Sequence, residues 1–175
     1  MNIFFLSWDP KKCAELYCDQ HVNKILLEIV QMLYTAWHCT NPEHVSHAPP
    51  RNDGHKGYKP VSNRNHAMVM WVRSHKNNYR WACLLGICLS KEFYKRYKKE
   101  HSCFKHIVWL FKNIPPIQDE IRNNRATYST TGFPTWVTPV PQCMPDEYKD
   151  PHLIVANFNY YRGDKLRFAR WSFKK

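Results

Sequence analysis

The chain has 175 residues, of which 43% are hydrophobic and 15% aromatic. This composition excludes a disordered protein and predicts one folded domain with enough residues to bury a core. Twenty-six Lys and Arg against 14 Asp and Glu give a formal net charge of +12, which favours a polyanionic partner such as DNA, RNA or a nucleotide. The basic residues concentrate in residues 91–105 and 162–175.

No apolar run approaches the about 18 residues of a membrane span, and residues 1–9 lack the regions of a signal peptide. We therefore expect an intracellular protein without a membrane partner. The seven cysteines are odd in number and form no C-x-x-C pair, so free thiols are expected. The Cys and His residues between positions 13 and 47 match no structural zinc spacing, and no metal or other cofactor is predicted.

The first helix is predicted from its cap. After a brief strand or extended lead-in over residues 3–6, Asp9 and Pro10 are typical of a helix start, and the helix is expected to run to about His38. Its circumference is apolar except for one stripe inside a sector of roughly 80°. The stripe consists of Tyr17, His21, Lys24, Glu28, Gln31 and Thr35.

Such a helix should be largely buried. Burying a lysine, a glutamate and a histidine is costly unless they pair or face a wet cleft, so the stripe should form a polar network or line a pocket, with perturbed pKa values. A buried Lys24–Glu28 pair, with His21 and Gln31 bonded to each other, would be the purely structural version of this arrangement.

A second helical pattern covers residues 65–99, with a candidate interruption within residues 74–78. On it, His66, Arg73, Asn77 and Arg80 fall in a sector of roughly 60°, which predicts either a second wall of the same cleft or an ordinary solvated face. It follows a loop rich in proline and glycine, residues 41–63.

The remaining elements are a short helix over residues 103–113, stopped before Pro115, and a second long loop over residues 127–150. That loop ends in Met144-Pro145-Asp146-Glu147-Tyr148-Lys149. Asp150 and Pro151 repeat the cap pattern and open a final helix toward Trp171. The chain is thus predicted to be a mainly α, single-domain helical bundle with two long ordered loops.

Four segments together carry a resemblance that covers nearly the whole chain. They are Asp9-Pro10; Asp19-Gln20-His21-Val22-Asn23-Lys24 with Glu28 and Gln31; Asn65-His66 with Trp71, Arg73, Ser74, Asn77, Tyr79 and Trp81; and the six residues from Met144 to Lys149. In these segments the chain resembles a family of small, largely uncharacterised proteins encoded by tailed phages and large DNA viruses. The resemblance implies a viral accessory protein, working in the host cytoplasm or nucleus during infection, and implies no particular activity.

Asp19-Gln20-His21, followed seven residues later by Glu28, and the basic, aromatic helix after Asn65-His66 are more distantly similar to the phage pyrimidine-dimer DNA glycosylases with AP lyase activity. Those proteins are small, basic and mostly helical. The resemblance implies that Glu28 is the catalytic carboxylate and that the nucleophile is the α-amine at the start of the chain.

Two departures from that family matter. Asn2 is a poor context for removal of the initiator, so Met1 rather than a small second residue would supply the α-amine. The family also carries arginines beside and just after its glutamate, where this chain has Leu27 and Gln31, which puts recognition of pyrimidine dimers in question.

The leading hypothesis is therefore an enzyme that acts on DNA or nucleotides, most like a base glycosylase and AP lyase. Met1 or Lys24 would attack the sugar, Glu28 would stabilise charge or shuttle protons, and His21 with Gln31 would orient Glu28. Trp71 or Tyr148 would hold an extruded base. The full set of predicted substrate-binding residues is Tyr17, Gln31, His66, Trp71, Arg73, Asn77, Asp146, Tyr148 and Lys149.

Two other functions stay open. A pocket containing His21, Lys24, Arg73 and Asp146 would suit a viral anti-defence protein that cleaves or sequesters a nucleotide signal. A DNA-binding protein without chemistry would use its basic helices to hold phosphates, and the stripe would then be structural.

Overall fold

The computed structural model describes residues 2–118 and 136–172. These residues form helices, and their only strand-like pairing is an isolated bridge between Pro50 and Lys56. The mainly helical fold is confirmed. The elements are α1 (Pro10–Leu16), α2 (Asp19–Thr40), the 3-10 helix η1 (Pro42–His47), α3 (Ala67–Ser74), α4 (Lys76–Tyr97), α5 (Phe104–Lys112), the 3-10 turn η2 (Asp146–Tyr148), α6 (Leu153–Tyr160) and the π-helical turn η3 (Tyr161–Lys165).

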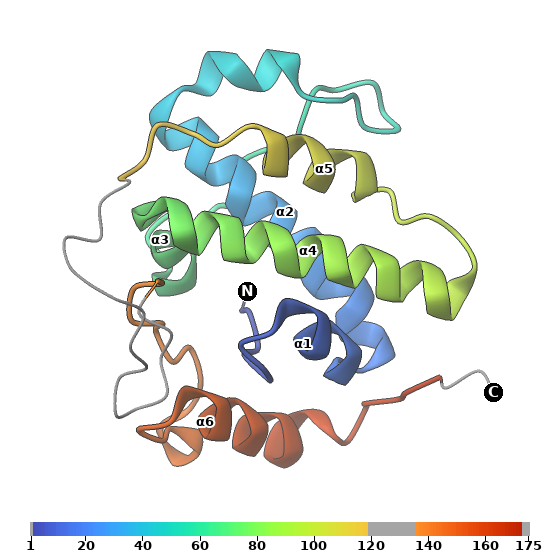
Figure 1. Ribbon diagram of the computed structural model, residues 1–175, viewed down its shortest axis with the longest axis vertical. Coiled ribbons are helices and arrows are strands. Elements are labelled where there is room, and N and C mark those ends of the chain that lie inside the picture. The colour runs from blue at the N-terminus through green and yellow to red at the C-terminus, as the bar shows by residue number, and fades with distance from the viewer. Residues whose placement is uncertain (1, 119–135, 173–175) are drawn as a thin grey trace.

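The two 22-residue helices α2 and α4 form the centre of the molecule. Figure 1 shows α2 passing behind α4, with α5 and η1 on one side of the pair and α1 and α6 on the other. The N-terminal segment, residues 3–6, is buried, forms no strand and turns at Leu6. Its Phe5 ring stacks on Trp81 with centroids 4.3 Å apart. No helix in the described part of the chain is both long and apolar enough to cross a membrane.

The predicted continuous helix from Pro10 to about His38 is wrong, because α1 and α2 are separate helices. Asp9 caps α1 as expected, its carboxylate accepting from the Lys11 backbone N–H at 2.8 Å. The chain then becomes extended at Tyr17 and Cys18. The break places the Tyr17 ring in the core, where its hydroxyl accepts from the Phe4 N–H and donates to the Phe4 carbonyl, both at 2.8 Å. Tyr17 is therefore not a binding residue on an α2 stripe.

The predicted interruption of the second helix is confirmed at His75, which is extended and accepts from the Asn77 N–H at 3.1 Å to cap α4. His66 caps α3 in the same way, accepting from the Met68 N–H at 3.2 Å. The expectation that His66, Arg73 and Asn77 share one helical face is wrong, because His66 lies before α3 and Asn77 belongs to α4.

The loops and the last helix also differ from expectation. The first predicted loop contains η1, and residues 127–135 of the second lie outside the described residues. Asp150 does not cap α6, since its carboxylate accepts from the His152 N–H at 2.8 Å in a local turn and the helix begins at Leu153. The helical backbone ends with η3, well before Trp171.

Residues 168–172, the last that the structure describes, are hydrogen-bonded to the first turn of α2. The Asp19 N–H donates to the Arg170 carbonyl at 2.7 Å, and the Gln20 amide donates to the Phe168 carbonyl at 2.8 Å. Ser172 donates from its backbone N–H and its hydroxyl to Asp19 Oδ2, at 2.9 and 2.7 Å. Asp19 and Gln20 therefore have a structural task, binding a segment about 150 residues away in sequence.

Candidate functional site

Glu28 lies beside the start of the chain. Its side chain is 14% exposed, and its Oε2 accepts from the Asn2 backbone N–H at 3.1 Å. The other oxygen, Oε1, lies 3.8 Å from Lys24 Nζ. Met1 lies outside the described residues. The predicted carboxylate thus holds the residue that follows the predicted α-amine, a contact that joins two segments 26 residues apart.

Asn2 also connects Glu28 with the other two motif regions. Its side-chain amide donates to the Cys143 carbonyl at 3.1 Å, immediately before the segment from Met144 to Lys149. Burial raises the pKa of the Cys143 thiol, and a hydrogen bond from the Met68 backbone at the start of α3 opposes that rise. The α2 stripe, the start of α3 and the segment after Cys143 therefore meet around Asn2.

The side chains in the middle of the stripe are more exposed to solvent than predicted. The Lys24 side chain is 70% exposed, so the desolvation that would make a lysine nucleophilic near neutral pH is absent. Gln31 is half-buried, and its backbone carbonyl accepts from the Thr35 hydroxyl at 2.7 Å. Only Tyr17, His21 and Thr35, at the two ends of the stripe, are buried. The expectation of a buried Lys24–Glu28 pair is wrong, because Lys24 is exposed.

His21 is buried but does not orient Glu28. Its Nδ1 shares a hydrogen bond of 2.8 Å with the Tyr161 hydroxyl, and its ring stacks on Phe4 with centroids 4.8 Å apart. His21 and Glu28 are seven positions apart on the helix, which is about 10 Å along the axis. Burial, together with smaller contributions from the charges of Lys165 and Lys24, lowers the pKa of His21 to about 4. His21 thus packs the N-terminal segment onto α2.

Two buried histidines predict a loss of stability in weak acid. Burial is the main cause that lowers the pKa of both His21 and His106 from 6.5 to about 4. Between these pH values the unfolded chain binds protons that the folded chain does not. The free energy of unfolding should therefore fall as pH falls from 6.5 to 4, by up to roughly 3 kcal/mol for each histidine.

Denaturant unfolding at several pH values between 7.5 and 4.5 measures this loss. His106 bonds the Tyr34 hydroxyl through Nδ1 at 2.9 Å, and Lys105 and Arg51 add positive charge near it. A His106→Gln variant lacks that titration, so its stability should depend on pH less steeply than that of the wild type over this window. Part of the dependence should remain, because burial also lowers the pKa of His21 and of His101. Equal slopes for the two proteins would contradict the assignment to His106.

The segment after Cys143 places its predicted binding residues on the surface. Asp146 and Lys149 form an exposed ion pair, with Oδ1 and Nζ 2.6 Å apart, and this hydrogen bond lowers the pKa of Asp146. The Tyr148 ring packs on Tyr160 with centroids 5.3 Å apart. It also lies so close to Gly163 that a Cβ there would meet a ring carbon at 2.3 Å. Tyr148 is docked on α6 and η3 rather than free to stack on a base.

Trp71 is buried rather than displayed. Its ring meets Phe5 edge-on with centroids 5.4 Å apart, and its indole N–H donates to the Thr138 carbonyl at 3.0 Å. The prediction that Trp71 offers a free stacking face is wrong, because the ring belongs to the core.

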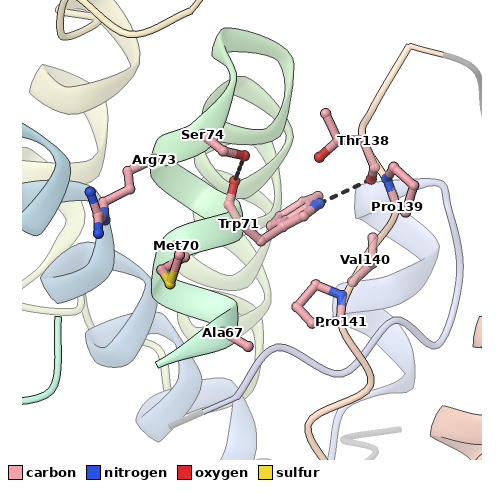
Figure 2. Close-up of a pocket in the computed structure, with 9 residues that line it drawn as sticks. All are labelled: Ala67, Met70, Trp71, Arg73, Ser74, Thr138, Pro139, Val140 and Pro141. Carbon is pink, nitrogen blue, oxygen red and sulfur yellow. Dashed lines mark hydrogen bonds between the residues drawn. The ribbon is translucent and has the colours of Figure 1, made fainter. Parts of the chain in front are cut away.

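One edge of Trp71 still reaches an open pocket of about 530 Å³ between α3 and residues 138–141. Figure 2 shows the pocket, with Arg73 extending away from Trp71 toward α2. The pocket is lined by Ala67, Met70, Trp71, Arg73, Ser74, Thr138, Pro139, Val140 and Pro141.

Exposed cations surround the first turns of α2. Besides Lys24, they include Lys99, which lines a small pocket with Gln20 and Asn23, and Arg170, whose carbonyl binds Asp19. Arg167 lies three residues before Arg170 and is also exposed. Positive charge therefore accumulates at the N-terminal end of α2, whereas Glu28 lies near the middle of this helix.

The seven cysteines are free, as predicted. Within residues 2–118 and 136–172, no three His, Cys, Asp or Glu side chains are grouped to hold a metal ion. Comparison of the chain with models of protein families, with curated proteins and with solved structures finds no match.

Proposed function

We propose that the protein is a viral enzyme acting on DNA, with the chemistry of a base glycosylase and AP lyase. The observation that carries the proposal is the 3.1 Å hydrogen bond between the Asn2 backbone N–H and Glu28, since it brings a carboxylate to the start of the chain. An amine with an adjacent carboxylate is what imine chemistry on a sugar requires.

In this mechanism the amine nitrogen bonds to C1′ of the sugar, and the bond between C1′ and the base breaks. The base departs with the electron pair and takes up a proton, while the amine loses protons as the sugar ring opens to an imine. Glu28 accepts a proton from the amine, and its negative charge stabilises the cationic imine. Removal of a C2′ proton then expels the 3′ phosphate and cleaves the strand.

Met1 is the better of the two amines. An α-amino group has an ordinary pKa of about 7.7 to 8.0 and a lysine one of about 10.4, so a larger share of an α-amine is unprotonated at neutral pH. Lys24 is 70% exposed and pairs with Glu28 at 3.8 Å, so no desolvated pocket holds its amine. The proposal therefore assigns the attack to the α-amine of Met1 and leaves Lys24 to neutralise phosphates.

The charge distribution supports DNA as the substrate. Lys24 lies 3.8 Å from Glu28, the exposed cations Lys99, Arg167 and Arg170 lie near the first turn of the same helix, and the chain as a whole carries +12. Phosphate contacts of this kind position a duplex without reading its sequence.

Borohydride trapping tests the proposal directly. The protein is incubated with duplexes that carry an abasic site, a thymine dimer or uracil, and with an undamaged duplex, in the presence of borohydride. We expect a covalent adduct on at least one damaged duplex and none on the undamaged one, with the attachment mapped by mass spectrometry to Met1. Attachment to Lys24 would correct the choice of amine, and no adduct on any duplex would refute the imine mechanism.

A further inference from the structure

A second, more apolar pocket lies between α1 and the segment that runs from α6 to residue 171, on the side of the molecule where Figure 1 shows α1 and α6. Its volume of about 390 Å³ is within the range of about 300 to 1,000 Å³ typical of small-molecule sites. Leu16 on α1 and Leu166 after η3 are 40% and 50% exposed, so the lining is open to solvent. The pocket is lined by Leu6, Glu15, Leu16, Phe158, Tyr161, Arg162, Leu166 and Trp171.

The polar groups of the aromatic lining residues are already bonded within the protein. The Trp171 indole N–H donates to the Leu16 carbonyl at 3.2 Å. The Tyr161 hydroxyl accepts from the Cys18 backbone N–H and shares a hydrogen bond with His21 Nδ1, both at 2.8 Å. These bonds also join the walls of the pocket before a ligand binds, which reduces the ordering cost of binding. A peptide would leave its own backbone N–H and C=O groups unpaired against such a lining.

Arg162 supplies the positive charge of the pocket. Its guanidinium carbon lies 5.8 Å from the ring centroid of Phe158, which is another lining residue. Asp164, two positions later, pairs with Lys165 and Arg167. Among the carboxylates that the structure describes, none forms an ion pair with Arg162. The pocket therefore combines an apolar interior with one uncompensated guanidinium.

Glu15, the other charged lining residue, has cations of its own. It also lines a separate pocket between α1 and α4. That separate pocket contains the lysines Lys11, Lys91 and Lys95. Burial raises the pKa of the Cys88 thiol there, and the negative charge of Glu15 adds to the rise. The Glu15 carboxylate thus acts on the α4 side of α1, and Arg162 keeps its net positive charge.

We infer that the pocket beside Arg162 binds a small amphiphilic anion, an unbranched fatty acid, with the acyl chain between Leu16 and Leu166 and the carboxylate on Arg162. An acyl chain needs no hydrogen bonds, so it matches a lining whose polar groups are engaged. A guanidinium binds a carboxylate through two parallel N–H bonds. The net charge of +12 disfavours a second copy of the chain as the occupant, because like charges repel. None of the lining residues contacts Glu28 or Asn2, so the inference does not depend on the proposed function.

Titration of the full chain with octanoate, followed by NMR at the indole N–H of Trp171, tests the inference. Octanoate should bind with a Kd below about 1 mM, the weak end of specific affinity. Hexanoate is shorter by two methylenes and should bind up to about 16-fold more weakly, since burial of each methylene contributes about a factor of 4.

Arg162→Gln should weaken octanoate binding at least about 10-fold, as expected for loss of a charge-assisted hydrogen bond. Octan-1-ol has the same chain without the carboxylate, so it should bind this variant and the wild type equally. Arg64→Gln, at an exposed arginine outside the pocket, is the matched control and should bind octanoate like the wild type. Unchanged octanoate binding by Arg162→Gln would overturn the assignment of the carboxylate to Arg162.

Leu166→Glu places a carboxylate in the lining from a half-exposed position and should weaken octanoate binding at least about 10-fold, because like charges are brought together. Leu84→Glu, at a leucine on α4 that is 39% exposed and lies outside the pocket, is its control. The inference fails if octanoate does not bind, or if Leu166→Glu leaves its binding unchanged. It also fails if sedimentation shows a dimer of the wild type that Leu166→Glu dissociates, since the occupant would then be a second copy of the chain.

Discussion

A Glu28→Gln variant is expected to form the borohydride-trapped adduct at least about 100-fold more slowly than the wild type, the lower bound for loss of a general acid–base group. Glutamine has the same shape, and its amide oxygen can still accept the Asn2 N–H that Glu28 binds at 3.1 Å. It cannot take a proton from the amine or stabilise a cationic imine by charge. Initial rates of adduct formation on abasic-site DNA, read from a denaturing gel, measure the effect.

Glu43→Gln is the matched control, since Glu43 is an exposed glutamate on η1. It should trap DNA at the wild-type rate. Thermal melting of both variants should show an intact fold, because Glu28→Gln keeps the anchoring hydrogen bond. Equal trapping rates for Glu28→Gln and the wild type would reduce Glu28 to an anchor for the N-terminal segment.

An Arg96→Met variant is expected to lower the free energy of unfolding by about 3 to 5 kcal/mol, the usual cost of breaking a buried ion pair. The Arg96 side chain is 5% exposed. It donates to Asp19 Oδ1 and to the Tyr17 carbonyl, both at 2.8 Å, and to Glu92 Oε1, also at 2.8 Å. Removing the guanidinium leaves the shielded Asp19 carboxylate without a counter-charge and leaves Glu92 with only the exposed Lys95. Guanidinium chloride unfolding near pH 7 measures the loss.

Lys95→Met provides the comparison, because Lys95 pairs with the same Glu92 at 3.6 Å but is 71% exposed. Exposed ion pairs contribute about 1 kcal/mol or less, so this variant should unfold close to the wild-type midpoint. If Arg96→Met were no more destabilising than Lys95→Met, the buried network would not be a main source of stability.

Local signals in the sequence predicted the helices well. They predicted poorly the helix breaks that depend on tertiary contacts. The cap of α1 at Asp9 depends on neighbouring residues only, and it was predicted correctly. No glycine or proline near Tyr17 and Cys18 indicates in the sequence that the helix breaks there. It depends on the Tyr17 hydroxyl reaching both polar backbone atoms of Phe4, a contact that only the folded chain creates.

The candidate site could be predicted in part. Polarity on an otherwise apolar helix draws attention to Glu28, and its role stays a prediction. Periodicity alone could not tell which stripe positions are covered, and Lys24 is in solvent. Asn2 was missed because it reaches Glu28 through its backbone N–H, a group that nearly every residue has. The Cys143 carbonyl was missed for the same reason. These two backbone groups belong to the candidate site only because the fold places them beside Glu28 and Asn2.

The fastening of residues 168–172 to the first turn of α2 has a consequence for folding. The ribosome synthesises α2 early and residues 168–172 about 150 positions later. The hydrogen bonds between Asp19 and Ser172 therefore cannot form until synthesis is nearly complete. Contacts so distant in sequence form late and slowly. A nascent chain that ends before residue 168 can already bring Arg96 to Asp19 but leaves Asp19 Oδ2 and the Gln20 amide open. The beginning of α2 reaches its final state only when the far end of the described chain has been made.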